Sequence, residues 1–451
     1  MSHKFEPSIL REYDIRGIVG ETLGAEDARA IGRSFATMLL NAGGTKIVVG
    51  YDGRISSPML EHALVEGILA SGCDVVRIGL SATPMLYYAQ AVMAGVGAGI
   101  QITGSHNPPN YNGFKMVFQG RPFFGSDIQA LGDLALQGEW IDGLGTSEER
   151  LILGEYVDRI LEELSDVDPE YLGSLRVGWD AGNGSAGPAL ERLVEKMPGK
   201  HIVLFSEVDG SFPNHHPDPT VETNLKDLKN LIKDEELDFG IAFDGDGDRL
   251  IIIDSNGREL DGDDILYVIA KNKFESKIHL GVKGVVGTLM TNKGLEKAFN
   301  DEGIELVRSD VGDKYVLQKL NELNWTLGGE QSGHILCLDK SNTGDGIIAA
   351  IQFLQSIVVL NKTIPELLSE FKKYPQILTN VKVKDGNKVL KNKKLQKAQK
   401  KSEELLETFD GRVLIRKSGT EHKIRIMVES NSQEATSEQS VLLTELVESI
   451  S

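Results

Sequence analysis

Residue types that can handle a phosphoryl group gather at residues 103–109, which are Thr-Gly-Ser-His-Asn-Pro-Pro. The apolar run before them, 96–102, predicts a buried strand. The glycine permits unusual backbone angles and the two prolines lack an N–H, so the chain continues here neither as a strand nor as a helix. We therefore expect a rigid turn that presents Ser105 and His106 at a strand end, with Lys115 nine residues after the histidine.

A hydroxyl, an imidazole and an amine on one such loop could bind and transfer a phosphoryl group. The alternative is an Asn/Pro turn that only ends a strand, because clusters of this composition usually are turns. Other stretches of the chain decide between these two interpretations.

A second stretch, AFDGDGDR, places Asp244, Asp246 and Asp248 at alternate positions after a predicted strand, 239–243. Unpaired carboxylates this close repel one another, and the glycines between them let the chain curl around one centre. Hard oxygen ligands of this kind favour Mg²⁺, with the remaining positions left to water or phosphate oxygen. The stretch therefore predicts a Mg²⁺ site, and a solvated acidic turn is the alternative.

An EF-hand calcium loop does not fit the same stretch. Its sixth position is Arg249 where a glycine is required, and its twelfth is Ser255 where a glutamate is required. The arginine directly after the aspartates favours a phosphate bound beside the metal.

Three further segments could contact a sugar phosphate, although each is a weak signal alone. Residues 330–334, Glu-Gln-Ser-Gly-His, supply donors and acceptors suited to vicinal hydroxyls. Residues 416–420, Arg-Lys-Ser-Gly-Thr, offer a guanidinium, two hydroxyls and backbone amides, which commonly hold a phosphate; a surface turn is the alternative. Arg16 could clamp a phosphate or form a structural ion pair with Asp14.

Length and composition bound the class of protein. At roughly 150 residues per domain, 451 residues predict about three or four domains. The net charge of −19 argues against nucleic acid as a partner and requires any phosphate pocket to be locally basic. Cys73 and Cys337 form no metal-spaced pair. No apolar run approaches the ~20 residues of a membrane helix and the start has no signal-peptide core, so we expect a cytoplasmic enzyme without membrane contact.

Strands alternate with helices along most of the chain, which predicts largely parallel sheets covered on both faces. Three such α/β units are expected over 1–150, 151–255 and 256–372, and a smaller α+β unit over 373–451. Within the last unit, the Lys-rich stretch 384–401 is interpreted as the solvated face of an amphipathic helix. The main elements expected elsewhere are helices 25–40, 59–71 and 225–232, and strands 46–50, 74–78, 175–180 and 284–287.

Four motifs in this order, TGSHNPP with NGFK, DGDGDR, GEQSGH and RKSGTE, resemble those of the α-D-phosphohexomutases. The resemblance covers essentially the whole chain. It implies an α/β fold of four domains around a central cleft: phosphoserine-bearing, metal-binding, sugar-binding and, in the α+β domain, phosphate-binding. Small-molecule sugar phosphates are the implied partners, and a monomer or homodimer is expected.

In that family, a phosphoserine in the first motif gives its phosphate to a hexose phosphate. The resulting hexose 1,6-bisphosphate then returns its other phosphate to the serine. The resemblance thus implies Ser105 as the phosphoserine, and hexose 1,6-bisphosphate as activator and intermediate. The Ser105 phosphate would hold Mg²⁺ together with Asp244, Asp246 and Asp248.

The resemblance also implies roles for the other segments. The groups that assist phosphoryl transfer and proton movement would be Arg16, His106, Lys115 and Arg249. The groups that contact the sugar would be Glu330, Ser332 and His334, and those that hold the distal phosphate Arg416, Ser418, Gly419 and Thr420. Closure of the last domain over the substrate would exclude water, which otherwise hydrolyses the phosphoserine.

The two halves of the chain resemble different branches of the family. REYDIRG and FPNHHPDP resemble phosphomannomutase/phosphoglucomutase, whereas VGDKYV, GEQSGH and SGTE resemble bacterial phosphoglucosamine mutases. Gln331 stands where the first branch usually has Met, and Asp313 lies where it has a Gly-His pair. We expect mannose and glucose phosphates as substrates. Glucosamine phosphates are the alternative, because Asp313 could bind a cationic 2-amino group.

Other classes of function fit less well. A serine hydrolase would need a G-x-S-x-G turn, and the adjacent Ser105 and His106 side chains tend to diverge. A dinucleotide-binding oxidoreductase would need G-x-G-x-x-G with an acidic residue ~20 positions later. A non-catalytic sugar-phosphate sensor could share the fold, but the intact nucleophile and metal loop argue against it.

Overall fold

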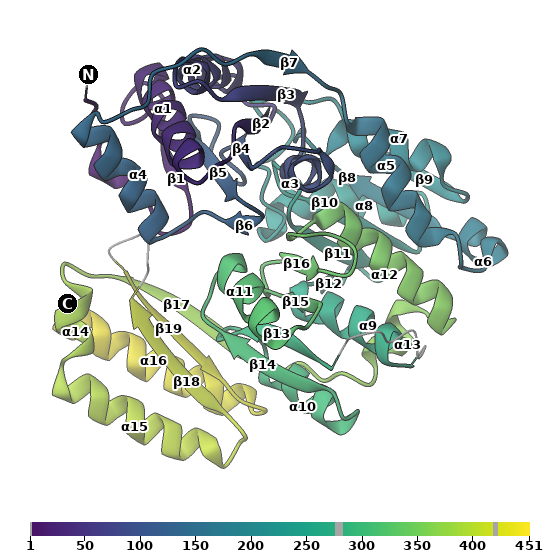
Figure 1. The fold of residues 1–451 in the computed structure, drawn as a ribbon. Helices are drawn as coiled ribbons and strands as arrows, with labels where there is room; N and C mark the ends of the chain where they lie inside the picture. The colour runs from purple at the N-terminus through teal and green to yellow at the C-terminus, as the bar shows by residue number, and fades with distance from the viewer. Residues whose placement is uncertain (1, 276–282, 418–422) are drawn as a thin grey trace. The chain divides into compact units, whose positions relative to one another are not determined.

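The computed structural model of the protein describes most of the chain, namely residues 2–275, 283–417 and 423–451. The chain divides into two compact units. The first comprises Met1–Leu289 and Val307–Pro365, and the second comprises Met290–Leu306 and Glu366–Ser451. Four β-sheets with their helices make up the described part of the chain (Figure 1).

The first sheet consists of β1 (Ile15–Ile18), β2 (Lys46–Tyr51), β3 (Asp74–Leu80), β4 (Ala98–Ile102), β5 (Tyr111–Phe118), β6 (Arg121–Pro122) and β7 (Ser147–Glu149). Its order is β1-β5-β4-β2-β3-β7, with β6 paired to β5. The strands from β4 to β7 in this order run parallel, and β5 is antiparallel to both β1 and β4. The helices of this part are η1 (Pro7–Ile9), α1 (Ala25–Asn41), α2 (Ser57–Ala70), α3 (Thr83–Val92) and α4 (Ser126–Gln137).

Helices cover both faces of the first sheet. Ile47 and Ile100 belong to one apolar cluster with residues of α1 and α2. On the opposite face, a Cβ at Gly99 would lie 3.1 Å from Val48 and 3.5 Å from Leu86 of α3. All five residues of β4 are buried, and four of them, all but Gln101, are apolar or glycine, as expected for a strand covered on both faces.

The second sheet consists of β8 (Arg176–Asp180), β9 (Lys200–Leu204), β10 (Phe239–Phe243), β11 (Leu250–Asp254) and β12 (Glu259–Leu260). In the order β12-β11-β10-β8-β9, the last three strands are parallel and the first two are antiparallel additions. Its helices are α5 (Leu153–Leu161), η2 (Glu162–Leu164), α6 (Pro169–Ser174), α7 (Gly187–Lys196), η3 (Glu222–Leu225) and α8 (Lys226–Asp234).

The third sheet has the order β14 (Glu305–Ser309), β13 (Gly284–Thr288), β15 (Leu327–Gly329) and β16 (Ile335–Cys337). The helices of this stretch are α9 (Gly262–Glu275), α10 (Lys293–Asp301), α11 (Asp313–Leu323), α12 (Gly346–Leu360) and α13 (Ile364–Leu368). Of these, α10 belongs to the second compact unit.

The fourth sheet is antiparallel and lies wholly in the second unit. Its order is β17 (Gln376–Lys382), β19 (Lys423–Glu429) and β18 (Arg412–Lys417), and its helices are α14 (Gly386–Leu390), α15 (Lys393–Glu407) and α16 (Gln433–Ile450). The Lys-rich stretch forms two helices instead of one. Asp385 and Asn392 each accept hydrogen bonds from backbone N–H groups two residues on, so each begins a helix of its own.

The predicted fold class is confirmed: three mixed α/β domains precede a smaller α+β domain. The predicted strands and helices appear with ends shifted by up to about two residues. The exact domain boundaries stay predictions. Both cysteines are buried and unpaired. Among the described residues, no helix combines the length and apolar character needed to cross a bilayer.

The contact between α1 and α2 depends on two glycines. A Cβ at Gly32 would lie 2.3 Å from the carbonyl oxygen of Leu64, and one at Gly67 would lie 2.2 Å from that of Arg29. Gly32→Ala must therefore separate the helices, and this cost outweighs the gain in helix propensity of about 1 kcal/mol. We expect a net loss of roughly 1–2 kcal/mol, measured as a lower thermal unfolding midpoint.

Gly173→Ala in α6 is the matched control, because its nearest neighbouring atom would be 3.8 Å away. It should leave the unfolding midpoint unchanged or slightly raised. An unchanged midpoint for Gly32→Ala would contradict the close approach of α1 and α2.

Candidate active site

Ser105 lies on a tight turn directly after β4. Its backbone φ is +49°, a left-handed conformation that costs a non-glycine residue roughly 1–3 kcal/mol. Its N–H donates to Thr103 Oγ1 at 2.8 Å, and its Oγ donates to Asp244 Oδ2 at 3.0 Å. The Oγ also lies 3.2 Å from His106 Nδ1. The predicted hydroxyl and imidazole are thus adjacent, and the hydroxyl faces the acidic loop.

The acidic loop follows β10 and brings its three carboxylates together. One ligand atom from each of Asp244, Asp246 and Asp248 lies within 4.8 Å of the other two, and all three residues are buried. Gly247 has φ +75°, so the chain reverses between the second and third aspartates. In the part of the chain that the structure describes, this is the group of three acidic side chains with metal-binding geometry.

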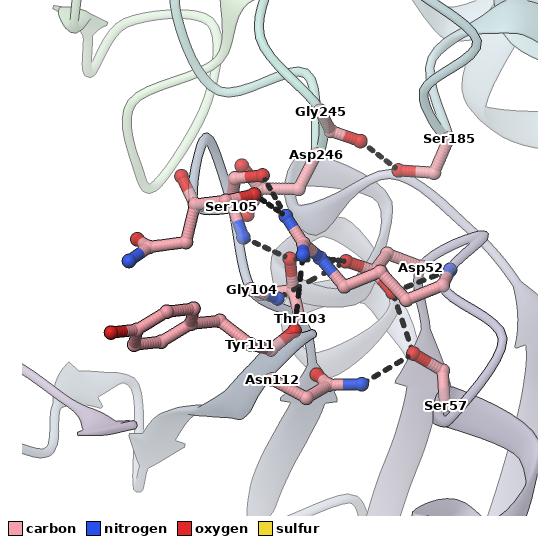
Figure 2. A network of polar contacts seen from close by, with 12 residues as sticks. Asp52, Ser57, Thr103, Gly104, Ser105, Tyr111, Asn112, Ser185, Gly245 and Asp246 are labelled. Carbon is pink, nitrogen blue, oxygen red and sulfur yellow. Dashed lines mark hydrogen bonds and ion pairs between the residues drawn. The ribbon is translucent and has the colours of Figure 1, made fainter. Parts of the chain in front are cut away.

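Two other loops hold the acidic loop through hydrogen bonds to the backbone of Gly245. The carbonyl oxygen of Gly245 accepts bonds from the backbone N–H of Ser185 at 3.0 Å and from its Oγ at 3.2 Å (Figure 2). The Gly245 N–H donates to the carbonyl oxygen of Pro217 at 3.2 Å. Ser185 belongs to the Gly-rich turn before α7, and Pro217 to the loop rich in Pro and His. Both loops therefore have a positioning role.

Lys115 projects from β5 and neutralises part of this charge. Its Nζ contacts Asp246 Oδ2 at 2.7 Å and also Asp248 Oδ2. Burial alone would lower the pKa of Lys115, but the nearby carboxylates outweigh burial and raise it. Burial raises the pKa of Asp244, and the neighbouring carboxylates raise it further. Burial would also raise the pKa of Asp248, but Lys115 and His334 outweigh burial and lower it.

These residues fit a divalent cation. Asp246 Oδ1 is buried and has no hydrogen-bond partner among the described residues. Asp248 Oδ1 is also buried, and its nearest cation, His334 Nδ1, is 3.6 Å away. Buried carboxylate oxygens are costly unless they bind a cation, and an all-oxygen donor set suits Mg²⁺.

Two arginines line the same site. Arg16 on β1 donates from Nη1 to the carbonyl oxygen of Gly104 at 2.9 Å and to Asn107 Oδ1 at 2.6 Å, and from Nη2 to Asp14. The structural ion pair weighed from sequence therefore exists, and Arg16 also contacts the serine turn. Arg249 Nε lies 4.0 Å from Asp248 Oδ1. Burial opposes its charge, but Asp248 and Asp244 raise its pKa.

His106 differs from the neighbouring cations in the direction of its pKa shift. Burial lowers its pKa well below the ordinary value, and the Arg249 and Arg16 guanidiniums lower it further. It is therefore a neutral imidazole beside the Ser105 hydroxyl, able to accept or pass a proton.

The third domain contributes charged groups to this region. Asp313 Oδ2 lies 3.7 Å from His334 Nε2, and His334 stands between Asp313 and Asp248. Burial lowers the pKa of His334, but the two carboxylates outweigh burial and raise it to about 9. Glu330 accepts a bond from the Gly312 N–H at 2.8 Å, and burial raises its pKa. Ser332 is partly exposed in the same loop.

The predicted phosphate loop belongs to the last domain, and its role stays a prediction. Arg416 lies near the end of β18, in the second compact unit. Ser418, Gly419 and Thr420 lie outside the described residues.

Sequence reasoning missed three residues that support the site. Thr83, at the start of α3, donates from Oγ1 to Asp246 Oδ2 and from its N–H to the Asp246 carbonyl oxygen at 2.9 Å. Asp52 and Arg54 bind the serine turn. Two sequence signals were available, the Thr-Pro that starts a helix at 83–84 and the Asp-Gly-Arg that follows β2. Neither signal indicates which residues its side chains contact in the folded chain.

A serine hydroxyl beside a cation site, with buried or partly buried lysine and arginine cations around it, can accept, hold and release a phosphoryl group. Positioning and charge neutralisation are what that reaction requires most. A Ser-His hydrolase would need the imidazole oriented by a third group, and the described contacts of His106 include no such carboxylate.

Comparisons with known proteins cover nearly the whole chain. Four stretches match families described as "Phosphoglucomutase/phosphomannomutase": alpha/beta/alpha domains I, II and III and the C-terminal domain, at residues 7–140, 154–257, 261–374 and 378–445. Phosphoglucosamine mutase of Aliivibrio fischeri (strain MJ11) is 37% identical over 445 residues, covering 96% of this chain and 97% of that protein. The same-named protein of Pseudoalteromonas translucida is 38% identical over 446 residues, covering 97% of each chain.

A solved structure gives a similar picture. The crystal structure of a phosphoglucomutase/phosphomannomutase family protein from Burkholderia thailandensis superposes with a TM-score of 0.86 at 31% identity, covering 98% of each chain.

The carboxylate cluster predicts a measurable cation affinity. Asp246→Asn removes one charge from the cluster, and we expect Mg²⁺ to bind at least about tenfold more weakly, a loss of about 1.4 kcal/mol. Titration calorimetry of the whole protein with MgCl₂ measures this change.

Asp209→Asn is the matched control, because Asp209 is a loop carboxylate that bonds only within its own turn among the side-chain contacts described. It should leave Mg²⁺ affinity unchanged. Equal affinities for Asp246→Asn and the unmodified protein would show that the cluster is not the cation site.

Proposed function

Because this chain belongs to the phosphoglucomutase/phosphomannomutase family, the α-D-phosphohexomutases, we propose that it interconverts hexose 1-phosphates and hexose 6-phosphates through a phosphoserine at Ser105. The observation that carries the proposal is the buried Ser105 hydroxyl, 3.0 Å from a carboxylate of the Asp244–Asp248 cluster. Hexose 1,6-bisphosphate is the proposed intermediate and activator.

In the proposed reaction, the bond from phosphorus to Ser105 Oγ breaks as a hydroxyl oxygen of the sugar phosphate bonds to that phosphorus. Bound Mg²⁺, held by Asp244, Asp246, Asp248 and the Ser105 phosphate, would supply charge neutralisation to the phosphoryl oxygens. Lys115, Arg16 and Arg249 add fixed positive charge. The neutral His106 can carry the proton that the attacking hydroxyl loses.

The remaining roles are proposals of the same kind. Glu330 and Ser332 would bind sugar hydroxyls, and His334 would hold the carboxylate of Asp313 toward the sugar. The segment from Arg416 to Thr420 would bind the phosphate that is not reacting, since a guanidinium, hydroxyls and glycine-freed amides match a dianion.

For the sugar, we propose glucosamine 6-phosphate and 1-phosphate as the preferred pair. Two relatives at 37–38% identity are named phosphoglucosamine mutase, and Asp313 offers an ionised carboxylate. Burial raises the pKa of that carboxylate, but His334 and Lys314 outweigh burial and lower it. A 2-ammonium group would form a charge-assisted contact there.

Mannose and glucose phosphates are the second candidates. REYDIRG, TGSHNPPNYNGFK and FPNHHPDP, in the half of the chain that carries Ser105, resemble the phosphomannomutase/phosphoglucomutase branch. Asp313 and Gln331 lie in the other half.

Ser105→Ala tests the covalent step. The unmodified protein should gain the mass of one phosphoryl group from glucose 1,6-bisphosphate, whereas the variant should gain none. Its turnover should fall more than about 10³-fold, because no other nucleophile replaces the serine. Intact-mass spectrometry and a coupled mutase assay measure both effects.

The control is Ser174→Ala, at an exposed helix end where the hydroxyl bonds only to the Tyr171 carbonyl oxygen among the contacts described. It should phosphorylate and turn over normally. Near-normal turnover of Ser105→Ala would contradict the proposed function.

Asp313→Asn tests the choice of sugar. We expect kcat/KM for glucosamine 1-phosphate to fall about 10- to 100-fold, the equivalent of roughly 1.5–3 kcal/mol for a charged hydrogen bond. The values for glucose and mannose 1-phosphate should change far less. Parallel steady-state assays of the three substrates give these ratios.

Asp310→Asn, three residues earlier and exposed, provides the matched control and should alter none of the ratios. If the unmodified protein uses mannose or glucose 1-phosphate tenfold better than glucosamine 1-phosphate, the second candidates replace the first.

A further inference from the structure

Arg54 is a buried cation that the proposed reaction does not use. It lies in the turn between β2 and α2, and only 1% of its surface is exposed. Its guanidinium binds four backbone carbonyl oxygens of the segment that follows β4. From Nη2 it donates at 2.7 Å to Ser105 and Asn107, and from Nη1 to Pro108 at 2.6 Å and Tyr111 at 3.0 Å.

Its fifth N–H, on Nε, donates to Asp52 Oδ2 at 3.1 Å. An arginine side chain has five N–H donors, so each of them has an acceptor here. Burying a guanidinium is costly unless its donors are satisfied. Four of the five acceptors belong to the loop that carries the nucleophile, so Arg54 fixes the backbone of that loop.

Asp52 holds the other side of the same loop. Its carboxylate accepts bonds from Thr103 Oγ1 at 2.8 Å, from the Gly104 N–H at 3.2 Å and from Ser57 Oγ at 2.6 Å (Figure 2). Asp52 therefore holds the residues before Ser105, and Arg54 holds Ser105 and those after it. The ion pair of 3.1 Å between Asp52 and Arg54 joins these two sets of contacts.

The guanidinium packs closely against the backbone of the turn at Gly104. A Cβ at Gly104 would lie 2.4 Å from Arg54 Cζ. The guanidinium also lies over the ring of Phe212, with 5.2 Å between Cζ and the ring centroid. A left-handed φ at a serine persists only where the surrounding contacts over-determine it, and these contacts do so at Ser105.

We propose that Asp52 and Arg54 are positioning residues for phosphoryl transfer, which hold the Ser105 turn so that its Oγ faces the Asp244–Asp248 cluster. The proposal rests on the proposed function of Ser105. Neither side chain binds the Ser105 hydroxyl itself in the contacts described; both act through the backbone and Thr103. Displacement of a reacting atom by about 1 Å can lower a rate about 10²-fold.

Arg54→Lys is the principal test. Lysine keeps the charge but cannot present five donors in one plane. We expect kcat, and the rate at which glucose 1,6-bisphosphate phosphorylates Ser105, to fall about 10- to 100-fold, while KM for the hexose phosphate stays within about twofold. Asp52→Asn, which keeps the shape but removes the charge, should lower the same two rates.

Arg77→Lys is the matched control. Arg77 on β3 pairs with Glu61 through two bonds of 2.6 and 2.7 Å, in the same domain but without a described bond to the serine turn. It should lower the thermal unfolding midpoint at most, and leave kcat and the phosphorylation rate unchanged.

Rescue by a small molecule separates positioning from stability. Arg54→Ala leaves a space of guanidinium shape, so guanidinium chloride at millimolar concentration should restore part of kcat, whereas methylammonium chloride should not. If Arg54→Ala does not fold, the comparison of Arg54→Lys with Arg77→Lys decides the question.

Arg54→Lys could lower the unfolding midpoint and still leave kcat and the phosphorylation rate equal to those of the unmodified protein. That result would overturn the positioning role but not the proposed function. A Ser105 that gains no phosphate in the unmodified protein would instead overturn the proposed function, and the positioning role with it.

Discussion

Three buried aspartates, each with a carboxylate oxygen within 4.8 Å of one from the other two, impose the main constraint on this structure, in a chain whose net charge is −19. Two unit charges 4 Å apart interact by about 4 kcal/mol at an effective dielectric constant of 20, so the cluster needs cations close by. Lys115 comes from the first sheet, Arg249 from the loop that follows β10, and His334 from the loop before β16. Charge neutralisation therefore joins the first three domains.

Polar contacts between the first three domains follow the same arrangement. Thr83 of the first domain binds Asp246 of the second through both its hydroxyl and its N–H. Tyr156 on α5 donates to Asp345, which begins α12 of the third domain, at 2.8 Å. Tyr13, three residues before Arg16, donates to the carbonyl oxygen of Val311, two residues before Asp313, at 2.8 Å. The first of these contacts fixes the loop that carries the aspartates, and the last fixes the segments that carry Arg16 and Asp313.

The sequence predicted what depends on local pattern. A largely apolar run, 96–102, predicted β4, and alternating Asp and Gly predicted the carboxylate cluster, because both patterns lie in neighbouring residues of the chain. Arg54 was not predicted, because its partners are backbone carbonyls about 51–57 residues away and carbonyls have no sequence signature. The second helix start at Asn392 was missed because the Lys-rich pattern continues through it. The Asn392 side chain bonds to the backbone N–H of Lys394 and so begins a new helix there.

The proposed reaction also requires the groups around Ser105 to be held rigidly, whereas the contacts to the sugar must tolerate two orientations. One serine must receive phosphate from either end of the hexose, so the groups around Ser105 are fixed, by Arg54 and Asp52 behind the turn and by Ser185 behind the acidic loop. The sugar must bind in two orientations, so contacts that match its shape in only one of them would oppose the reaction. An electrostatic contact with the sugar tolerates such reorientation better than a contact that depends on shape complementarity, because the attraction between charges falls slowly with distance. In the proposed reaction, the carboxylate of Asp313, which lies beside His334, would be a contact of that kind.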